Sequence, residues 1–579
     1  MAQNLEFVRH TLSHLMAAAV LQHRPDAKRT LGPAIENGFY YDFEFPSPLS
    51  DEDLPAIEQS MRDILPSWKE FEHREVSPEE AREYFSDNPY KLEMIDEIVA
   101  KGEKITLYTS GNFTDLCRGG HVDHPAQDIP ADAFKLDKLA GAYWRGNEKN
   151  AQLTRIYGLA FASKSELDAY LTMREEAKKR DHKILGPALD LFVFSDLVGS
   201  GLPLWTPRGT LLRNLLDDFV WTLRKSRGYE RVEIPHITKK ELYVTSGHWA
   251  KYKDDLFRIT TREGHEFAMK PMNCPHHTQI YARRLWSYRD LPQRYANTTT
   301  CYRDEQTGEL SGLSRVRAFA QDDAHVFCRI SQAKDEFLKI WDIVHEFYPK
   351  FGFALTVRLS RHDPAHMEKY LGDPELWKKA EDILSDIVHD KGIDVIDGLG
   401  EAAFYGPKLD FLAKDSLGRE WQVATIQLDM NMPERFDLTC VNEEGQRERI
   451  VMIHAAIMGS IERFLSILIE HTGGAFPLWL SPVQATVHPI SDKHAEAAAT
   501  LAEQLRSAGL RVEVSSGGET IGKRIRESEK QKVPYSLVLG DKDIAANAVS
   551  VRVRGGVDLG QIPLPDLIKR LSDEVANKG

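Results

Sequence analysis

The sequence predicts an α+β protein built from several domains, and three observations lead to this prediction. The chain has 579 residues, which is far more than one hydrophobic core usually organises. Residues 186–480 alternate helical stretches with β-rich segments, and residues 481–579 alternate short strands with helices. Hydrophobic residues make up 42% of the chain and charged residues 28%, as in ordinary globular proteins.

A charged run without glycine, Ser163–Lys183, marks the first domain boundary. Glu166 follows Ser163 by three residues, a pattern typical of the start of a helix. We therefore expect a solvated linker helix over residues 163–185. Before it, residues 1–162 mix helix and strand signals, with turns at Asn37, Gly102 and Gly119.

The proline-containing segment Phe476–Pro482 marks the next boundary. Strands and helices alternate after it: strands are expected at Ala485–His488, Arg511–Val514 and Tyr535–Leu539, and helices from His494 and from Ile521. Alternation of this kind is typical of a small α/β domain with a largely parallel sheet. We place this domain at residues 481–579 and the central domain at residues 186–480.

Composition excludes several classes of protein. No apolar stretch approaches the ~20 residues that span a bilayer, and the apolar patch Leu15–Leu21 is too short for a signal peptide. Five cysteines without paired spacing indicate no disulfide framework. A cytoplasmic protein without a membrane partner is expected. The net charge of −14 argues against nucleic acid only weakly, because phosphate contacts depend on local basic patches.

One phosphate-loop pattern is misleading. Gly517 to Lys523 nearly matches G-x-x-x-x-G-K-[ST] between a strand and a helix. The next residue is Arg524, which lacks the hydroxyl that holds magnesium. A tight turn between strand and helix is the better interpretation.

The central region carries ordered motifs, each weak alone: Cys301-Tyr-Arg-Asp-Glu305, Arg315-Val-Arg-Ala-Phe319-Ala-Gln-Asp-Asp-Ala-His325 and His454-Ala-Ala-Ile-Met-Gly-Ser-Ile-Glu-Arg463. Together they resemble the second and third signature motifs of class II aminoacyl-tRNA synthetases, and Pro235 stands where the first motif has its proline. Two further segments, Met269-Lys-Pro-Met-Asn-Cys274-Pro and Tyr405-Gly-Pro-Lys408, are similar to the corresponding segments of the threonyl family. The resemblance runs from about residue 5 to the C-terminus.

This resemblance implies an antiparallel-sheet catalytic domain, an α+β editing domain and an α/β anticodon-binding domain. It also implies ATP-dependent joining of L-threonine to threonine tRNA. Attack of the threonine carboxylate on the α-phosphate needs positioning and charge stabilisation. By resemblance, Arg303 and Arg463 are catalytic and bind ATP together with Glu305, Arg315 and Phe319. Mg²⁺ would accompany the phosphates.

The resemblance further implies one zinc ion per subunit, held by Cys274, His325 and His454. Spacing alone would not suggest this site, since isolated Cys and His residues usually pack in cores. Three protein ligands leave an open position, as in active zinc sites. A hydrophobic pocket cannot strongly separate threonine from the nearly isosteric valine. Zinc that contacts the threonine amine and hydroxyl would reject valine.

Further pocket residues come from the same resemblance. Asp323 is the candidate acceptor for the threonine hydroxyl proton. Gln321, Tyr405 and Gln422 are candidate substrate contacts. Lys408 and His248 are additional catalytic candidates, and His248 stands where the family has a histidine linked to transfer.

Serine keeps the hydroxyl and lacks one methyl group, which separates it from threonine by only ~1–3 kcal/mol. A second, hydrolytic site is therefore expected. His10 and His14 lie one helical turn apart, and Cys117 and His121 share the same offset. Alone, such a pair is usually a surface feature of an amphipathic helix.

The two pairs together resemble the editing domain of threonyl and alanyl synthetases. In that domain Lys91 and Asp115 are further candidates for orienting water or substrate. The alanyl relatives hold zinc in this quartet, whereas the threonyl family resembles a metal-free site. We expect no metal here.

Three departures from the family stand out. Many members begin with a small ubiquitin-like module, which this sequence does not show. The third motif usually reads His-Arg, whereas this sequence has His454-Ala455. The family's Arg-Asn-Glu-Lys-Ile-Gly appears as Gly517-Gly-Glu-Thr-Ile-Gly522, which leaves the anticodon readout open.

The family also implies a homodimer. Two rival interpretations remain at this stage. One is a synthetase-like regulatory protein without catalysis, and the retained Arg303 and Arg463 count against it. The other is a free-standing editing hydrolase, which would not need the catalytic domain.

Overall fold

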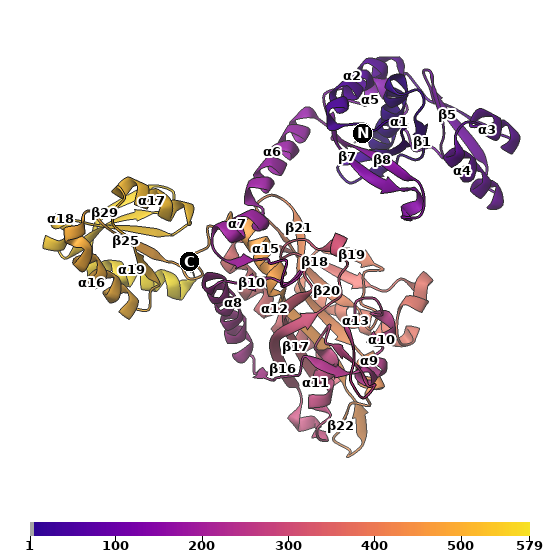
Figure 1. The fold of residues 1–579 in the computed structure, drawn as a ribbon. Coiled ribbons are helices and arrows are strands. Elements are labelled where there is room, and N and C mark those ends of the chain that lie inside the picture. Colours follow the sequence, from indigo (N-terminus) through magenta and orange to yellow (C-terminus); the bar gives the residue numbers. More distant parts are fainter. Residues whose placement is uncertain (1–4, 579) are drawn as a thin grey trace. The chain divides into compact units, whose positions relative to one another are not determined.

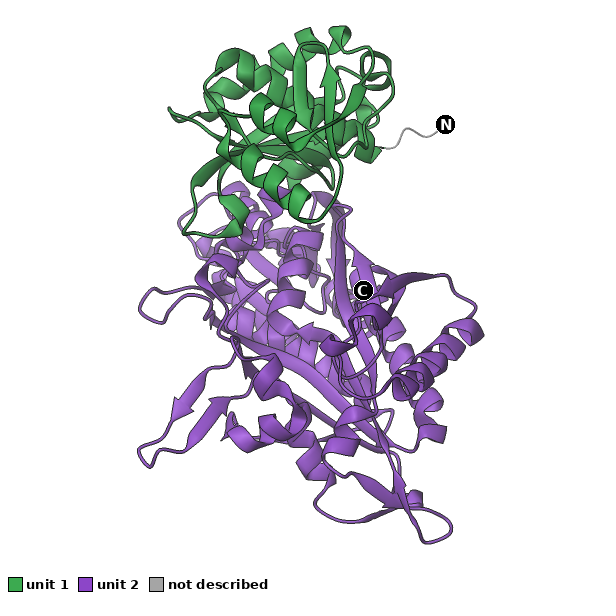
Figure 2. Ribbon diagram, turned by 90° about the vertical axis from the view of Figure 1, so that its right-hand side faces the viewer, with its two compact units in different colours: residues 1–176 green, residues 177–579 purple. Residues whose placement is uncertain are grey.

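The computed structural model of the chain describes residues 5–578. The chain divides into two compact units, Met1–Glu176 and Ala177–Gly579 (Figure 2). The boundary lies inside helix α6 (Lys164–Arg180). Within residues 5–578, no helix combines the length and apolar character needed to cross a membrane.

The segment expected to be one linker helix is two helices. The Glu166 N–H donates to Ser163 Oγ at 3.3 Å, which caps the start of α6. After α6, the Asp181 side chain accepts from the Lys183 N–H at 2.8 Å and caps the short helix α7 (His182–Ala188). The linker thus breaks at Asp181 because a second helix starts there.

Unit 1 is built around helix α1 (Leu5–His23), which is buried from Thr11 to Val20. Three consecutive alanines, Ala17 to Ala19, let neighbouring elements approach closely. The helix packs on an antiparallel sheet of order β1-β3-β8-β7, with β2 paired to β3 (Figure 1). The strands are β1 Lys28–Arg29, β2 Ala34–Ile35, β3 Gly38–Glu44, β7 Phe134–Tyr143 and β8 Gln152–Ala160.

A smaller subdomain completes unit 1. Its antiparallel sheet contains β4 (Glu72–Val76), β5 (Ile105–Ser110) and β6 (Phe113–Leu116). Helices α3 (Pro78–Tyr84) and α4 (Pro89–Ala100) accompany it. Strand β6 carries Asp115 and helix α4 carries Lys91, so this subdomain supplies two of the predicted editing residues.

Unit 2 centres on an eight-stranded sheet of order β11-β16-β17-β24-β21-β20-β18-β19. All pairs are antiparallel except the two outermost, β11 with β16 and β18 with β19. The strands are β11 Glu230–Arg231, β16 Gln293–Tyr302, β17 Ala318–Cys328, β18 Ala354–Arg361, β19 Val395–Leu399, β20 Lys408–Lys414, β21 Glu420–Asp429 and β24 Val451–Ser460. The predicted antiparallel-sheet domain is confirmed.

Three helices contribute to the largest hydrophobic core together with this sheet. They are α8 (Pro207–Lys225), α12 (Ala333–Phe347) and α15 (Ile461–Thr472). Apolar residues recur along one face of α12, which buries Phe337, Ile340 and Val344. Helix α15 is buried almost all round, so the position of its first turn is tightly determined.

The C-terminal part contains a five-stranded sheet of order β26-β25-β27-β28-β29. Its elements are β25 Ala485–Pro489, α16 Ala495–Ser507, β26 Val512–Val514, α17 Ile521–Lys530, β27 Tyr535–Leu539, α18 Asp541–Ala545, β28 Ala548–Val553, β29 Val557–Pro563 and α19 Leu564–Asn577. Only β26, β25 and β27 are parallel; β28 and β29 are antiparallel. The expectation of a largely parallel sheet is corrected, because Gly555 and Gly556, both at positive φ, form a tight hairpin turn there.

Candidate active sites

Three metal-type donors meet beside the central sheet of unit 2. His325 on β17 lies directly opposite His454 on β24 in the antiparallel register. Cys274 begins the short helix α11 (Cys274–Tyr281). The three side chains are buried, and their donor atoms all lie within 4.8 Å of one another.

The outer nitrogens of the two histidines already have partners. His325 Nδ1 lies 2.8 Å from His277 Nδ1, and His454 Nε2 lies 3.0 Å from Asp429 Oδ2. His325 Nε2 and His454 Nδ1 therefore face each other at 3.1 Å. Burial lowers the pKa of His325 far below its usual range, so this imidazole is neutral. Neutral imidazoles whose second nitrogen is hydrogen-bonded are what a zinc site requires, so this donor set fits the metal.

A cavity of about 430 Å³ opens beside these donors. Among the predicted site residues, it is lined by Cys274, His325, His454, Arg303, Arg463, His248, Gln321, Asp323, Tyr405 and Gln422. Tyr252, Thr425 and Gln427 also line it and were not predicted. Thr425 and Gln427 continue the strand that carries Gln422, and this shared strand was the available signal.

Two arginines border the cavity without a carboxylate partner among residues 5–578. Arg303 directly follows β16, and its buried Nε atom forms no hydrogen bond. Arg463 lies in the first turn of α15, where Ser460 Oγ accepts from its backbone N–H at 3.2 Å. A buried donor without a partner in a native fold calls for a ligand, and a guanidinium matches phosphate and carboxylate oxygens.

A bulge in β17 separates two neighbouring aspartates. The register shifts between Asp322 and Ala324, so the side chains of Asp322 and Asp323 lie in different environments. Asp322 forms a buried ion pair with Arg224, whereas Asp323 lines the cavity. Burial raises the pKa of Asp323 to about 6.

His248 lies at the start of helix α10 (His248–Lys251) and is 1% exposed. Its Nδ1 lies 2.8 Å from Ser246 Oγ. Burial, with smaller contributions from His454 and Arg303, lowers the pKa of His248 to about 3. The imidazole is therefore neutral where it lines the cavity.

Four predicted residues do not line the cavity in the described part of the chain. Glu305 lies 2.7 Å from the Arg315 guanidinium, which also pairs with Glu309 at 3.1 Å and is 50% exposed. Phe319 lies under the Arg303 guanidinium, 5.1 Å from ring centroid to Cζ. Lys408 pairs with the buried Asp410. The structure thus groups Glu305 and Arg315 in the loop beside the cavity.

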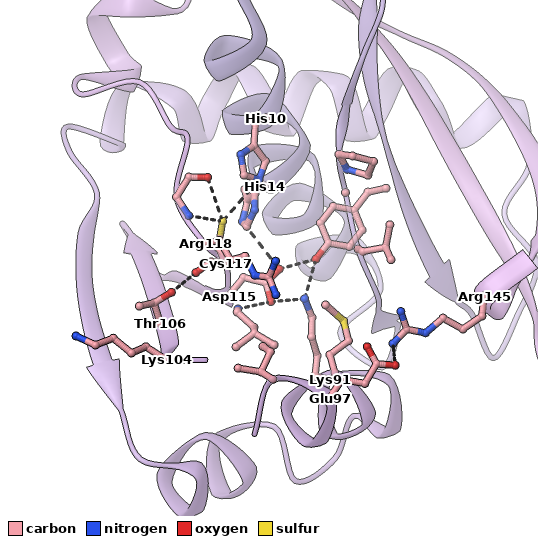
Figure 3. A pocket seen from close by; sticks show the side chains of 18 residues that line it. His10, His14, Lys91, Glu97, Lys104, Thr106, Asp115, Cys117, Arg118 and Arg145 are labelled. Atoms are coloured by element: carbon pink, nitrogen blue, oxygen red, sulfur yellow. Dashed lines mark hydrogen bonds and ion pairs between the residues drawn. The ribbon is translucent and has the colours of Figure 1, made fainter. Parts of the chain in front are cut away.

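A second group of donors lies in unit 1. His10 and His14 project from α1 toward Cys117, which follows β6 (Figure 3), and His121 lies with them. Cys117 Sγ lies 3.6 Å from His10 Nε2 and 3.3 Å from His121 Nε2. The rings of His10 and His121 stack with their centroids 4.4 Å apart. The structure therefore brings together four residues from distant parts of this unit.

A buried charge cluster lies beside this quartet. Lys91 Nζ lies 2.7 Å and Arg29 Nε 3.3 Å from Asp115 Oδ1, and the Tyr41 hydroxyl donates to Asp115 Oδ2 at 2.5 Å. Burial would raise the pKa of Asp115, but the Lys91 and Arg29 charges hold it well below its usual range. Neither Arg29 nor Tyr41 was predicted as a site residue, although Tyr41 ends the segment Ile35-Glu-Asn-Gly-Phe-Tyr-Tyr41, which also resembles the editing domain.

A cavity of about 370 Å³ joins the quartet to this cluster. His10, His14, Lys91, Asp115 and Cys117 line it, as Figure 3 shows, whereas His121 does not. Burial lowers the pKa of His14 to about 3 and raises that of Cys117 to about 11. The walls of the cavity thus carry neutral imidazoles, a protonated thiol and the ionised Asp115 carboxylate, and Glu97 adds a second carboxyl group.

Comparison with known protein families gives three matches. Residues 257–472 match the tRNA synthetase class II core domain (G, H, P, S and T), and residues 484–574 match the anticodon binding domain. Residues 105–157 match the threonyl and alanyl tRNA synthetase second additional domain. The antiparallel sheet and its cavity are therefore those of a class II aminoacyl-tRNA synthetase.

Individual relatives narrow the assignment. The chain is 48% identical over 573 residues to a threonine–tRNA ligase of Porphyromonas gingivalis, covering 98% of this chain and 87% of the relative. The chain is 47% identical to a threonine–tRNA ligase of Gloeobacter violaceus, and the alignment covers 100% of this chain and 93% of the relative. A crystal structure of the RNA binding domain of threonyl-tRNA synthetase from Cryptosporidium parvum matches with 38% identity and a TM-score of 0.65, covering 68% of this chain and 98% of that one. The chain belongs to the threonine–tRNA ligase family, as predicted.

Proposed function

We propose that this chain ligates L-threonine to threonine tRNA through a threonyl-adenylate, and that it also removes mischarged serine. Membership in the threonine–tRNA ligase family supports the ligase activity. The observation that carries the proposal is the cavity in which three metal-type donors lie beside two arginines that pair with no carboxylate of residues 5–578. Such a cavity suits a small amine and hydroxyl on one side and phosphates on the other.

Adenylate formation needs charge stabilisation around the α-phosphate. Arg303 would hold the α-phosphate and the threonine carboxylate, and Arg463 the γ-phosphate. Glu305, Arg315 and Phe319 would bind the remainder of ATP, with Mg²⁺ on the phosphates. The low-dielectric cavity strengthens these contacts while the charge reorganises.

Cys274, His325 and His454 would hold one zinc ion. When bound, zinc supplies an open coordination position that an amine and a hydroxyl can occupy but the methyl group of valine cannot. Asp323, at the rim of the donor set, would accept the threonine hydroxyl hydrogen. Gln321, Tyr405 and Gln422 would complete the pocket around the side chain.

Transfer to tRNA needs a group that orients the attacking hydroxyl. His248 would serve this purpose: burial lowers its pKa to about 3, so the neutral ring can accept a hydrogen bond but is too weak a base to take up the proton fully. The Tyr405 hydroxyl donates to Gln427 Oε1 at 2.6 Å, and the Tyr405 ring lies beside that of His248, with the centroids 6.3 Å apart. Lys408 does not line the cavity, because its ammonium group pairs with Asp410. It would therefore influence the reaction only through that pair.

We assign hydrolysis of seryl-tRNA to the unit 1 cavity, with His10, His14, Cys117 and His121 around the ester and Lys91 and Asp115 orienting water or the substrate amine. Lys91 and Arg29 bring two positive charges against the single carboxylate of Asp115. This excess of positive charge disfavours a bound cation, so we propose a site without resident metal. The total would then be one zinc per chain.

The proposed division of the chain follows the matched families. Residues 1–162 would edit, 163–185 link, 186–480 activate and transfer, and 481–579 bind the anticodon. The comparisons support the anticodon part at residues 484–574 and the editing part at residues 105–157. Cytoplasmic localisation is proposed from this role in translation.

We also propose a homodimer. Strands β9 (Phe192–Val193) and β10 (Leu204–Trp205) frame a segment with unusually exposed apolar side chains. Leu197 is fully exposed, and Phe194 and Val198 are more than 40% exposed. A second copy that covers this segment would remove that apolar area from water. Sedimentation of the full chain tests this assignment, and a monomer at micromolar concentration would contradict it.

Pyrophosphate exchange tests the central proposal. The chain should incorporate labelled pyrophosphate into ATP only when threonine and magnesium are present, and valine should not substitute. A regulatory protein without catalysis would give no exchange with any amino acid, and neither would a pure editing hydrolase. Absence of exchange with the zinc-loaded protein would therefore overturn the ligase assignment.

A further inference from the structure

A buried histidine outside both cavities connects three segments of unit 2. His182 is the first residue of α7 and is 3% exposed. Its Nδ1 lies 2.6 Å from Glu470 Oε1, and its backbone N–H donates to the same oxygen at 3.2 Å. On the other side of the ring, His182 Nε2 accepts from the Leu313 N–H at 3.0 Å. The ring thus links α7, the last turn of α15 and the loop that follows β16.

These contacts determine the tautomer of the ring. Nε2 faces an N–H group and must be the acceptor, so Nδ1 carries the hydrogen and donates to the Glu470 carboxylate. Asp181, His182 and Glu470 place donor atoms close enough for a metal. However, His182 Nε2 is occupied by Leu313, and the Arg419 guanidinium lies 2.7 Å from Glu470 Oε2. The group is therefore better described as a hydrogen-bonded link than as a metal site.

The loop is shaped to meet the histidine. Gly312 approaches the ring so closely that an added Cβ would lie 2.2 Å from His182 Nε2, and its φ of +51° also favours glycine. Leu313 is completely buried, so its N–H group needs an acceptor within the protein. Ser314 Oγ donates to Ser466 Oγ at 3.1 Å and adds a second tie to α15.

The same loop carries the residues proposed for ATP. It starts after Arg303 and includes Glu305 and Arg315, whose side chains pair at 2.7 Å. Its base is closed by the Arg303 N–H, which donates to the Arg317 carbonyl at 2.9 Å. The tip near Leu313 is held by His182, so displacement of the tip would shift Arg315 relative to the cavity.

We propose that His182 is a positioning residue for ATP: by accepting from the Leu313 N–H while donating to Glu470, it holds the 303–317 loop against the helix that carries Arg463. This inference rests on the proposed function, because the loop's role in ATP binding belongs to that proposal. It acts through main-chain geometry, and His182 itself touches no substrate.

Two substitutions separate the two hydrogen bonds. His182→Asn places an amide near the Nδ1 position and keeps the donor to Glu470, but it does not reach Leu313. His182→Gln reaches the Nε2 position and keeps an acceptor for Leu313. Threonine-dependent pyrophosphate exchange should show an increase of about tenfold in the KM for ATP with H182N, a much smaller change with H182Q, and little change in the KM for threonine with either. Amide hydrogen exchange at residues 311–315 should accelerate in H182N only.

His362 provides a matched control. Its Nδ1 and backbone N–H contact Glu381 Oε1 at 2.7 and 2.9 Å, which repeats the geometry of the His182–Glu470 pair away from the 303–317 loop. His362→Asn should therefore leave the KM for ATP unchanged. Gly312→Ala presses a methyl group onto His182 Nε2 from the loop side and should raise the KM for ATP as H182N does, which keeps the test available should H182N not fold.

The results distinguish failure of the proposed His182 role from failure of the proposed ligase function. If H182N and G312A keep the wild-type KM for ATP, the positioning role is wrong. Equal increases in the KM for ATP with H182N, H182Q and H362N would indicate general destabilisation and would also overturn it. Failure of the proposed function looks different, because wild-type enzyme would then show no threonine-dependent exchange at all.

Discussion

His325 Nε2 and His454 Nδ1 lie 3.1 Å apart across the β17–β24 pair, although 129 residues separate them in sequence. Each ring turns its other nitrogen to a separate partner, His277 or Asp429. At this distance the two facing nitrogens can share one hydrogen, or both can turn lone pairs to a cation bound beside them. This relationship, with Cys274 beside it, is the basis for the first prediction.

Removal of the thiol should remove both metal and activity. Cys274→Ser is expected to lower zinc from about one per chain to well below that value and to abolish threonine activation, because a serine hydroxyl is a poor zinc ligand. Elemental analysis and pyrophosphate exchange on the same preparation measure the two effects. Cys440→Ser is the control, since Cys440 is equally buried but lies on the separate strand β22 (Thr439–Val441). Full activation by demonstrably zinc-free enzyme would rule out the metal assignment.

Substitution of the two arginines of the second motif, Arg303 and Arg315, should affect adenylate formation to very different degrees. Arg303 borders the cavity with an unpaired Nε, so Arg303→Ala should reduce the rate constant for adenylate formation by roughly 10²–10³-fold. The Arg315 guanidinium is half exposed and pairs with Glu305 and Glu309. Arg315→Ala should therefore lower the rate constant much less and mainly raise the KM for ATP. Single-turnover measurements separate the two constants. Near wild-type rates with Arg303→Ala would show that the motif has been assigned wrongly.

The editing cavity should be separable from activation. His10→Ala combined with His14→Ala is expected to leave threonine-dependent pyrophosphate exchange intact while seryl-tRNA accumulates, because the substituted side chains lie in unit 1. His23→Ala is the matched control: it lies on the same helix but contacts Ser60 at the surface. Deacylation of pre-formed seryl-tRNA measures the effect. If the double variant clears seryl-tRNA at the wild-type rate, another site performs editing.

Editing should also tolerate mild acid. Burial lowers the pKa of His10 and takes that of His14 to about 3, and nearby Asp115 is held ionised by Lys91 and Arg29. His14 therefore remains neutral as the pH falls and His10 becomes protonated only below its ordinary range, whereas a histidine that titrates near 6.5 would be mostly protonated at about pH 5.5. The deacylation rate, corrected with the double variant, should fall by much less than the roughly tenfold loss expected for an ordinary histidine base. A tenfold loss centred near pH 6.5 would contradict the burial of these rings.

Several features were predictable from sequence because they depend on local patterns. The strand Tyr535–Leu539 was predicted with its observed bounds, since an apolar run between turn signals specifies a buried strand. The Ser163 cap marked the start of α6, because capping involves only neighbouring residues. The spacing of His10 and His14 already placed both rings on one face of α1. The antiparallel sheet and its family followed from ordered motifs rather than from any physical derivation.

Tertiary structure alone decided the rest. Strand register brought His325 opposite His454 and supplied Asp429 and His277 as their outer partners, and no local spacing encodes register between distant strands. Chain packing likewise placed Lys91 and Arg29 on Asp115, and His182 between Leu313 and Glu470. A sequence determines which side chains are available and their local periodicity. Burial and long-range pairing determine which of them share a low-dielectric site, and therefore which can perform chemistry together.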